Sequence, residues 1–361
     1  MTFPPKKTVK ILIVNDSQVL NAVIRATVET HPDYKVVASA LNGIEAVSQV
    51  KRHLPDLVLM DIHMPKMNGV EATHQITRSR PKTRILITSA TITRNMRHIF
   101  EALHHGATDY VRSPSLPFAP GTYITEQQLI QAGKDLLNKI HAVLEVSEKK
   151  LLQQIRPQHP LTQPSLQPTN NRQSKPLSLL AIGCSTGGPT TVIRLLKHLQ
   201  HPFPAPIIIC LHIDSELTQG FVSWLSDQTH FPCSVAHHQE RLENGRIYIA
   251  PGGKHNLGVG PGLQLLISTP EPKQFFFPNI NHLFSSIAKN VAGKSCGVVL
   301  TGMGNDGASG LKEMLQTGAI VLTQDEQSAV IDAMPRAARL ATNQEHGYPP
   351  EHLATKINRH L

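Results

Sequence analysis

Short apolar runs alternate with amphipathic stretches along most of this 361-residue chain, and each run is followed by polar or glycine-rich residues. Such alternation is typical of parallel β-sheets that are covered by helices on both faces. It stops between residues 153 and 175, where Gln, Pro, Asn, Ser and His predominate, so we expect a semi-extended, poorly ordered linker there. The sequence therefore predicts an α/β protein with two doubly wound parallel-sheet domains joined by a Pro/Gln-rich linker.

The expected elements follow from the apolar spacing. In the first half they are strands at 9–14, 35–40, 57–60, 84–88 and 107–111, and helices at 19–30, 43–53, 69–78 and 95–105. In the second half they are strands at 177–182, 206–212, 234–236, 246–250, 263–268, 296–300 and 319–323, and helices at 189–199, 217–227, 280–291, 306–316 and 335–340. A further helix at 126–154 has apolar spacing that suits either a helix closing the first domain or a dimer face.

Composition excludes some classes of protein. No apolar run approaches the ~20 residues of a membrane span, and the N-terminus has no cleavable apolar core, so we expect a cytoplasmic protein without membrane insertion. The net charge of +9 is compatible with binding to nucleic acid, anionic lipid or an acidic protein. The Lys and Arg residues are scattered and aromatic residues make up only 4%, which argues against nucleic-acid binding. The four cysteines form no Cys-x-x-Cys pair and are typical of buried residues in a reduced compartment.

A candidate nucleophile follows the first strand of the second domain, in Gly183-Cys184-Ser185-Thr186-Gly187-Gly188. Ser185 is central in a Gly-x-Ser-x-Gly turn before a helix, whereas Cys184, the alternative nucleophile, is not central. His212 follows another strand, and Asp306 lies in the glycine cluster Thr301-Gly302-Met303-Gly304-Asn305-Asp306-Gly307. Each alone could be structural, a buried histidine or a helix cap. Together at strand ends they predict a base and an orienting acid for Ser185.

The residues around Ser185 allow two other interpretations, an α/β-hydrolase and a phosphate-binding site. The order Ser, His, Asp differs from that of the α/β-hydrolases, in which the acid precedes the histidine. The glycines could also form a phosphate nest rather than an oxyanion site, although no Gly-Lys-Ser/Thr accompanies them.

The first domain carries carboxylates at two strand ends, Asp16 and Asp61, and a hydroxyl at a third, Ser89. Paired carboxylates suit Mg²⁺, and such a site suits phosphoryl chemistry, although each residue alone could be a helix cap. Over residues 9–115 the chain resembles a response-regulator receiver, a flavodoxin-like domain, in its run Met60-Asp61-Ile62-His63-Met64-Pro65. The resemblance implies Asp61 as phosphoacceptor, Ser89 as switch hydroxyl, and Asp16, Asp61 and His63 as the Mg²⁺ site. Asn15 and Ser113 depart from the usual acid and lysine.

The second domain resembles the chemoreceptor protein-glutamate methylesterase family, CheB, over residues 177–340. The matching motifs are those around Ser185 and Asp306, with Tyr248-Ile249-Ala250-Pro251-Gly252, Lys254-His255 and Met334-Pro335-Arg336. The resemblance implies a receiver at 8–125, a helix and linker at 126–176 and a Rossmann-like three-layer catalytic domain at 177–350. It further implies a Ser185-His212-Asp306 triad, oxyanion donors at Thr186 and Met303, and no cofactor for ester hydrolysis.

The partners that this resemblance implies are methylated chemoreceptors, which the family demethylates and deamidates at glutamine, and a chemosensory histidine kinase as phosphodonor. Asn15 and Ser113 are shared with the Wsp-type branch of the family. Leu211, Gly253, Asn279 and Asn281 depart from the usual pattern, which affects substrate docking more than chemistry. Two other functions are compatible with the sequence, a non-catalytic adaptor and a small-molecule esterase, but few aromatics are available for the apolar pocket of the latter.

Overall fold

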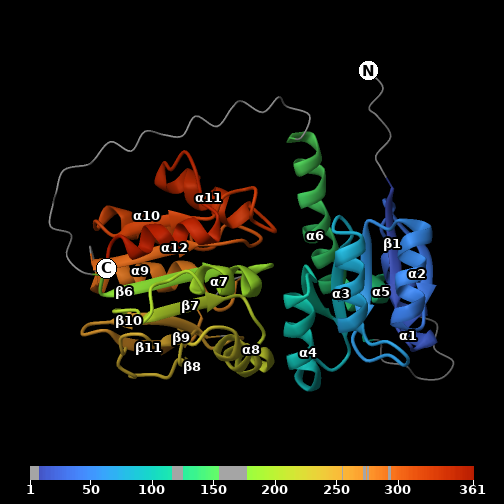
Figure 1. Ribbon diagram of the computed structural model, residues 1–361, viewed down its shortest axis with the longest axis horizontal. Helices are drawn as coiled ribbons and strands as arrows, with labels where there is room; N and C mark the ends of the chain where they lie inside the picture. The colour runs from blue at the N-terminus through green and yellow to red at the C-terminus, as the bar shows by residue number, and fades with distance from the viewer. Residues whose placement is uncertain are drawn as a thin grey trace. The chain divides into compact units, whose positions relative to one another are not determined.

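The computed structural model describes residues 8–115, 125–153, 177–253, 255–270, 274, 276–291 and 294–361, with side chains 145–153 excepted. The chain divides into two compact units, residues 1–145 and 146–361 (Figure 1). Both contain a parallel sheet with helices, as the sequence predicts. Residues 154–175 of the linker expected at 153–175 lie outside the described residues.

The first unit contains a 5-stranded parallel sheet in the order β2-β1-β3-β4-β5. The chain returns across β1 between β2 and β3, so right-handed crossovers put α1 on one face and α2, α3 and α4 on the other. The strands are β1 (Val9–Val14), β2 (Tyr34–Ala40), β3 (Leu57–Asp61), β4 (Arg84–Ser89) and β5 (Asp109–Arg112), and the helices are α1 (Gln18–Glu29), α2 (Gly43–His53), α3 (Gly69–Ser79) and α4 (Ile92–His104).

The expected helix at 126–154 is two helices, α5 (Glu126–Ala132) and α6 (Lys134–Gln153). They meet at Gly133, where an added Cβ would lie 2.0 Å from Thr27 Cγ2, so close packing against α1 requires glycine. Leu136 and Ile140 of α6 join the core of the first unit with Ile11. Of the two interpretations of this stretch, the helix that closes the first domain is therefore the one the structure supports for α6.

The second unit contains a 6-stranded parallel sheet in the order β13-β12-β6-β7-β9-β8. Its strands are β6 (Leu179–Cys184), β7 (Ile207–Leu211), β8 (Cys233–Val235), β9 (Ile247–Ile249), β12 (Ser295–Val299) and β13 (Ile320–Thr323). The expected strand at 263–268 is not part of this sheet. It is β11 (Gln264–Ser268), which pairs antiparallel with β10 (Asn256–Gly260), a strand that the sequence analysis missed.

The helices of the second unit are α7 (Gly188–Leu196), α8 (Ser215–Gln228), α9 (Ile280–Asn290), α10 (Ala308–Gln316), α11 (Ala333–Thr342) and α12 (Pro350–Asn358). Helix α12 begins where the catalytic domain was expected to end. It buries Leu353, Ala354 and Ile357, and its Glu351 forms an ion pair with Arg194 of α7 at 2.9 Å. These contacts make α12 an integral part of the second unit (Figure 1).

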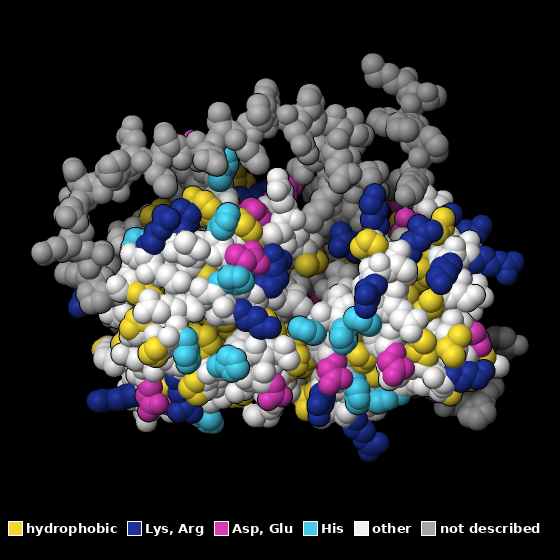
Figure 2. Space-filling model, in the orientation of Figure 1, with side chains coloured by type: hydrophobic (Ala, Val, Ile, Leu, Met, Phe, Trp, Pro, Cys, Tyr) yellow, Lys and Arg dark blue, Asp and Glu magenta, His cyan; other side chains and the backbone are white. Residues whose placement is uncertain are grey.

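None of the helices in the described ranges combines the length and the apolarity that a membrane crossing requires. Lys and Arg side chains lie dispersed over the face seen in Figure 2, among acidic and histidine side chains. The visible face therefore carries no continuous basic surface.

Candidate active site and receiver pocket

Three adjacent strands of the second sheet bring the predicted site residues to one edge. Strands β12, β6 and β7 are neighbours and parallel, so their carboxyl ends lie side by side. Ser185 directly follows β6, His212 directly follows β7, and the turn that contains Asp306 follows β12. Open α/β sheets bind ligands at such an edge, at the point where the connections from adjacent strands run in opposite directions.

Asp306 and His212 form a short contact in this edge. His212 Nε2 lies 2.9 Å from Asp306 Oδ2, and the two side chains are 13% and 0% exposed. A buried carboxylate that accepts from one ring nitrogen fixes the orientation of the ring and leaves the other nitrogen, Nδ1, to accept a proton. The predicted base and orienting acid therefore form the pair that the sequence analysis expected.

The carboxylate of Asp306 also binds the backbone of its surroundings. The N–H groups of Ile280 and Asn281, in the first turn of α9, donate to its two oxygens at 2.8 and 2.9 Å, and the Gly307 N–H donates at 2.9 Å. Asp306 thus receives helix N-terminal donors from α9 as well as the imidazole. The alternative role, capping of the helix that follows Asp306, is not seen, because the N-cap of α10 is Gly307 and no described side chain caps that helix. Asp306 instead accepts from the first turn of α9.

Ser185 is half-buried in a tight turn between β6 and α7. The Gly187 residue has φ of +76°, in the left-handed region that favours glycine, and a Cβ added at Gly302 would lie 2.8 Å from Ser185 Cβ. Among the described residues, Ser185 Oγ makes no hydrogen bond to His212, as is common in catalytic sites before substrate binds. The serine therefore lies on a turn that any larger neighbour at position 302 would displace.

Hydrogen bonds join the serine turn to the second glycine cluster. The Ser185 N–H donates to the Thr301 carbonyl at 3.0 Å, and Thr301 Oγ1 donates to the Thr186 carbonyl at 2.9 Å. The Ile331 N–H in turn donates to Thr301 Oγ1 at 2.9 Å. Thr301 is fully buried, so these bonds are shielded from water and fix the two turns relative to each other.

The two predicted oxyanion donors lie in these joined turns. Thr186 directly follows Ser185, and Met303 lies beside Gly304, whose φ is +84°. Within the described residues the Met303 N–H donates to no protein acceptor, as an oxyanion donor requires. Its side chain is 40% exposed, which places an apolar group at the surface of the site.

Cys184, the alternative nucleophile, is fully buried in β6 beneath the serine. Burial raises the pKa of its thiol far above the usual range, so the thiol stays protonated. The same cause raises the pKa of Cys210 well above its usual value and that of Cys233 and Cys296 to about 12. A buried, protonated thiol is a poor nucleophile, so Ser185 remains the candidate nucleophile.

The four residues near the site that depart from the usual family pattern occupy defined places in the structure. Asn279 Oδ1 caps α9 by accepting from the His282 N–H at 2.7 Å, and Asn281 Oδ1 accepts from the Gly310 N–H at 2.9 Å. Gly253 has φ of +75°, and Leu211 is buried. Asn279 therefore caps α9 and Asn281 joins α9 to α10, roles that sequence reasoning did not assign to them.

In the first unit, Asp61 ends β3 and Asp16 follows β1, which are neighbouring strands. Burial, supported by the nearby Asp16 carboxylate, raises the pKa of Asp61 to about 6. A buried carboxylate with a second carboxylate beside it is a fitting donor pair for Mg²⁺, which would neutralise an incoming phosphoryl group. Nowhere in the described ranges do three His, Cys, Asp or Glu side chains gather as a metal site, so backbone or water oxygens would complete the shell.

The ring of His63 contacts Asn95 of α4. Its Nε2 lies 2.6 Å from Asn95 Oδ1, and Asn95 Nδ2 donates to Ser89 Oγ at 2.9 Å. The role of His63 as a metal ligand stays a prediction, and in this structure its Nε2 is taken up by Asn95. Sequence reasoning missed Asn95, whose contact with the switch hydroxyl leaves no local sequence signal.

Ser113, which stands in place of the usual lysine, is 5% exposed. Its N–H donates to the Ser89 carbonyl at 3.0 Å, whereas its hydroxyl has no hydrogen-bond partner among the described residues. Position 113 therefore adjoins the switch residue and presents no cation there.

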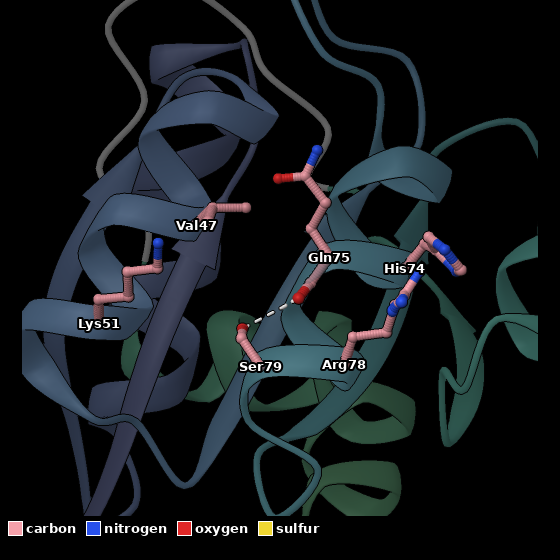
Figure 3. Close-up of a pocket in the computed structure, with 6 residues that line it drawn as sticks. All are labelled: Val47, Lys51, His74, Gln75, Arg78 and Ser79. Atoms are coloured by element: carbon pink, nitrogen blue, oxygen red, sulfur yellow. Dashed lines mark hydrogen bonds between the residues drawn. The ribbon is translucent and has the colours of Figure 1, made fainter.

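A surface pocket lies between α2 and α3, lined by Val47, Lys51, His74, Gln75, Arg78 and Ser79 (Figure 3). Helix α3 begins beside Asp61, because the Gly69 N–H donates to the Ile62 carbonyl at 2.8 Å, and it runs away from that edge to Arg78 and Ser79. This pocket is therefore remote from the carboxylates, and it contributes nothing to the candidate site.

Comparisons with known proteins identify the family of the chain. Residues 180–357 match the CheB methylesterase family model, and residues 11–117 match that of the response regulator receiver domain. The protein-glutamate methylesterase/protein-glutamine glutaminase 1 of Syntrophus aciditrophicus is 32% identical, over 96% of this chain and 96% of that protein. The counterpart of the group 3 operon of Pseudomonas putida is 34% identical, over 96% and 98%. The crystal structure of the Thermotoga maritima CheB methylesterase catalytic domain is 25% identical, with a TM-score of 0.49, covering 51% of this chain and 99% of that one.

Proposed function

Since this chain belongs to the CheB methylesterase family and carries a receiver domain, we propose that it hydrolyses glutamate γ-methyl esters on methylated chemoreceptors. The observation that carries the proposal is the buried pair of His212 and Asp306 beside the serine turn, with 2.9 Å between Nε2 and Oδ2. Receptor ester groups of this class lie on cytoplasmic helices, so the proposal places the protein in the cytoplasm.

In the proposed reaction, Ser185 Oγ attacks the ester carbonyl while its proton passes to His212 Nδ1. The oxyanion that forms accepts hydrogen bonds from the backbone N–H groups at Met303 and Thr186, a contribution of about 3 to 4 kcal/mol per donor in known cases. Methanol leaves with the proton from His212. Water then attacks the acyl-serine by the same route and releases the glutamate carboxylate.

The same steps with a glutamine side chain would release ammonia instead of methanol, since the amide and the ester share a carbonyl and differ only in the leaving group. The names of the relatives in Syntrophus and Pseudomonas include this glutaminase activity. We therefore include deamidation of receptor glutamines in the proposal.

We further propose that the receiver regulates the esterase. Asp61 would accept a phosphoryl group from a chemosensory histidine kinase, with Mg²⁺ held by Asp16 and Asp61 and with Ser89 contacting the phosphoryl oxygens. The support is the strand-end placement of all three residues and the receiver match over residues 11–117. Ester hydrolysis itself would need no cofactor.

Methanol release from methylated receptor membranes tests the proposal. We expect activity from the wild type, loss of most of it in Ser185→Ala and His212→Ala, and retention in Ser223→Ala, a matched control on the exposed face of α8. A folded wild-type chain that releases no methanol, yet still binds the receptor, would instead indicate a non-catalytic adaptor.

A further inference from the structure

We propose that Phe276 is a positioning residue for His212, and that the amide pair of Asn256 and Gln274 holds Phe276 in place. The inference rests on the proposed function, because it concerns the histidine of that triad. None of these three residues touches the reacting atoms. Their role is to orient the imidazole whose Nδ1 must face the serine.

The rings of Phe276 and His212 are stacked. Their centroids lie 5.3 Å apart and their planes differ by 9°, which is the geometry of an offset-stacked aromatic pair. The Phe276 ring also adjoins the turn that carries Asp306, since a Cβ added at Gly304 would lie 2.9 Å from Phe276 Cζ. Phe276 therefore covers one face of the imidazole, and the glycine turn restricts the positions that the Phe276 ring can occupy.

This contact supplies a constraint that Asp306 cannot supply alone. The hydrogen bond from Nε2 fixes one atom of the ring, but the ring can still tilt about that atom. Stacking against Phe276 restricts the tilt, so the two contacts together fix the direction of Nδ1. Proton transfer from a serine hydroxyl depends on that direction, because a misplaced base lowers the fraction of reactive geometries.

Phe276 is anchored through its backbone. Gln274 Nε2 donates to the Phe276 carbonyl at 2.8 Å, and the amides of Gln274 and Asn256 exchange two hydrogen bonds at 2.7 and 2.8 Å. Asn256 Oδ1 also accepts from the Asn279 N–H at 3.2 Å. Asn256 is 1% exposed in β10, so a buried amide ties the chain on both sides of Phe276 to the hairpin.

Kinetics of the full-length protein test the inference. Phe276→Leu keeps an apolar side chain but removes the aromatic face, so we expect kcat for methanol release to fall roughly two- to tenfold, the range of one aromatic pair. KM should stay within about twofold of the wild type, because substrate binding does not use the stack. Phe276→Tyr restores the face and should restore kcat, and Asn256→Ala should lower kcat in the same way.

Phe231→Leu is the matched control. Phe231 lies in the same unit, and its ring is also 5.3 Å from a histidine, His201, remote from the triad in the chain. Its kcat should equal that of the wild type. Unchanged kcat in Phe276→Leu, or a raised KM with unchanged kcat, would overturn the inference, since the second result describes a substrate contact.

An activity-independent measurement separates this inference from the proposed function. In the wild type, the His212 ring-proton NMR signals should carry the ring-current shift of a stacked phenyl group, and Phe276→Leu should remove it while Phe231→Leu does not. Identical His212 signals in the wild type and Phe276→Leu would overturn the stack even in an active enzyme. If Phe276→Leu loses the shift and the wild type releases no methanol, the stack is confirmed and the proposed esterase activity is refuted.

Discussion

Asp306 uses one carboxylate for two tasks, because it accepts from the His212 ring and from the first turn of α9. Its substitutions should therefore affect stability as well as activity. We expect Asp306→Ala to abolish most methanol release and to lower the free energy of unfolding by about 2 kcal/mol or more, because three backbone N–H groups lose their acceptor.

Asp306→Asn separates the two tasks, since it retains one oxygen acceptor. It should lose less stability than Asp306→Ala while remaining nearly inactive, because an amide does not favour the imidazolium. Urea unfolding and methanol release, measured on both variants, provide the comparison. Equal stability of wild type and Asp306→Ala would contradict the role of Asp306 as an acceptor for α9.

Asp61 gives a prediction about pH. Burial raises the pKa of its carboxyl from 3.8 to about 6, so between these values the folded chain binds a proton that the unfolded chain has released. Stability therefore falls as pH rises through this window and stays lower above about pH 6. Asp61→Asn cannot ionise, and without Mg²⁺ at pH 7.5 we expect it to be more stable than wild type by about 1 to 3 kcal/mol.

Two conditions should remove that difference. Near pH 4 both proteins are neutral at position 61, and with excess Mg²⁺ the wild-type carboxylates gain a counterion that Asp61→Asn cannot fully use. Calorimetry of the full chain, with and without Mg²⁺, measures the shift. An advantage of Asp61→Asn that is independent of pH would show that the carboxylate charge is not its cause.

At the level of the elements, the strands and helices that follow strong apolar spacing were predictable, and so was the placement of Ser185 and His212 directly after strands. Strand β10 was not, because two of its five residues, Gly258 and Gly260, weaken the strand pattern, and only pairing with β11 and packing against α9 define it. Phe276 lies outside a regular element, so its contact with His212, 64 positions away, has no local signal.

Helix α4 contributes Asn95, which links the switch hydroxyl of β4 to the loop after β3. In the proposed regulation Ser89 would turn toward the phosphoryl group on Asp61 and away from Asn95 Nδ2, from which its hydroxyl accepts, so the amide would oppose the switch by the strength of about one hydrogen bond. We expect Asn95→Ala to raise steady-state phosphorylation at limiting small phosphodonor about two- to tenfold.

A double-mutant cycle with Ser89→Ala is the control, because without the hydroxyl the amide has nothing to restrain. Phosphorylation of Ser89→Ala should be the same whether or not Asn95 is replaced. An equal gain from Asn95→Ala in both backgrounds would show that Asn95 acts by another route.

For the whole molecule, the question is how strongly phosphorylation of one unit changes catalysis by the other. Ser113 provides no ammonium to pair with the phosphoryl oxygens, so we expect modest stimulation of methanol release by phosphodonor in the wild type. Ser113→Lys should increase that stimulation by about fivefold or more, within the usual range of allosteric coupling.

Esterase rates of wild type, Asp61→Asn and Ser113→Lys, each with and without phosphodonor, decide this point. Asp61→Asn should show no stimulation. Stimulation of Asp61→Asn equal to that of the wild type would remove Asp61 from the regulation, and no gain in Ser113→Lys would show that the lysine is dispensable.

The burial of the thiols determines which side chains of the second unit peroxide can oxidise. Peroxide attacks thiolates that it can reach, whereas Cys184, Cys210 and Cys296 are enclosed and protonated. A serine does not form sulfenic acid, so Ser185 offers peroxide nothing to convert, whereas the exposed thioether of Met303 is open to oxidation to a sulfoxide. We therefore expect any inactivation of the second unit by peroxide to begin at Met303 rather than at a buried cysteine.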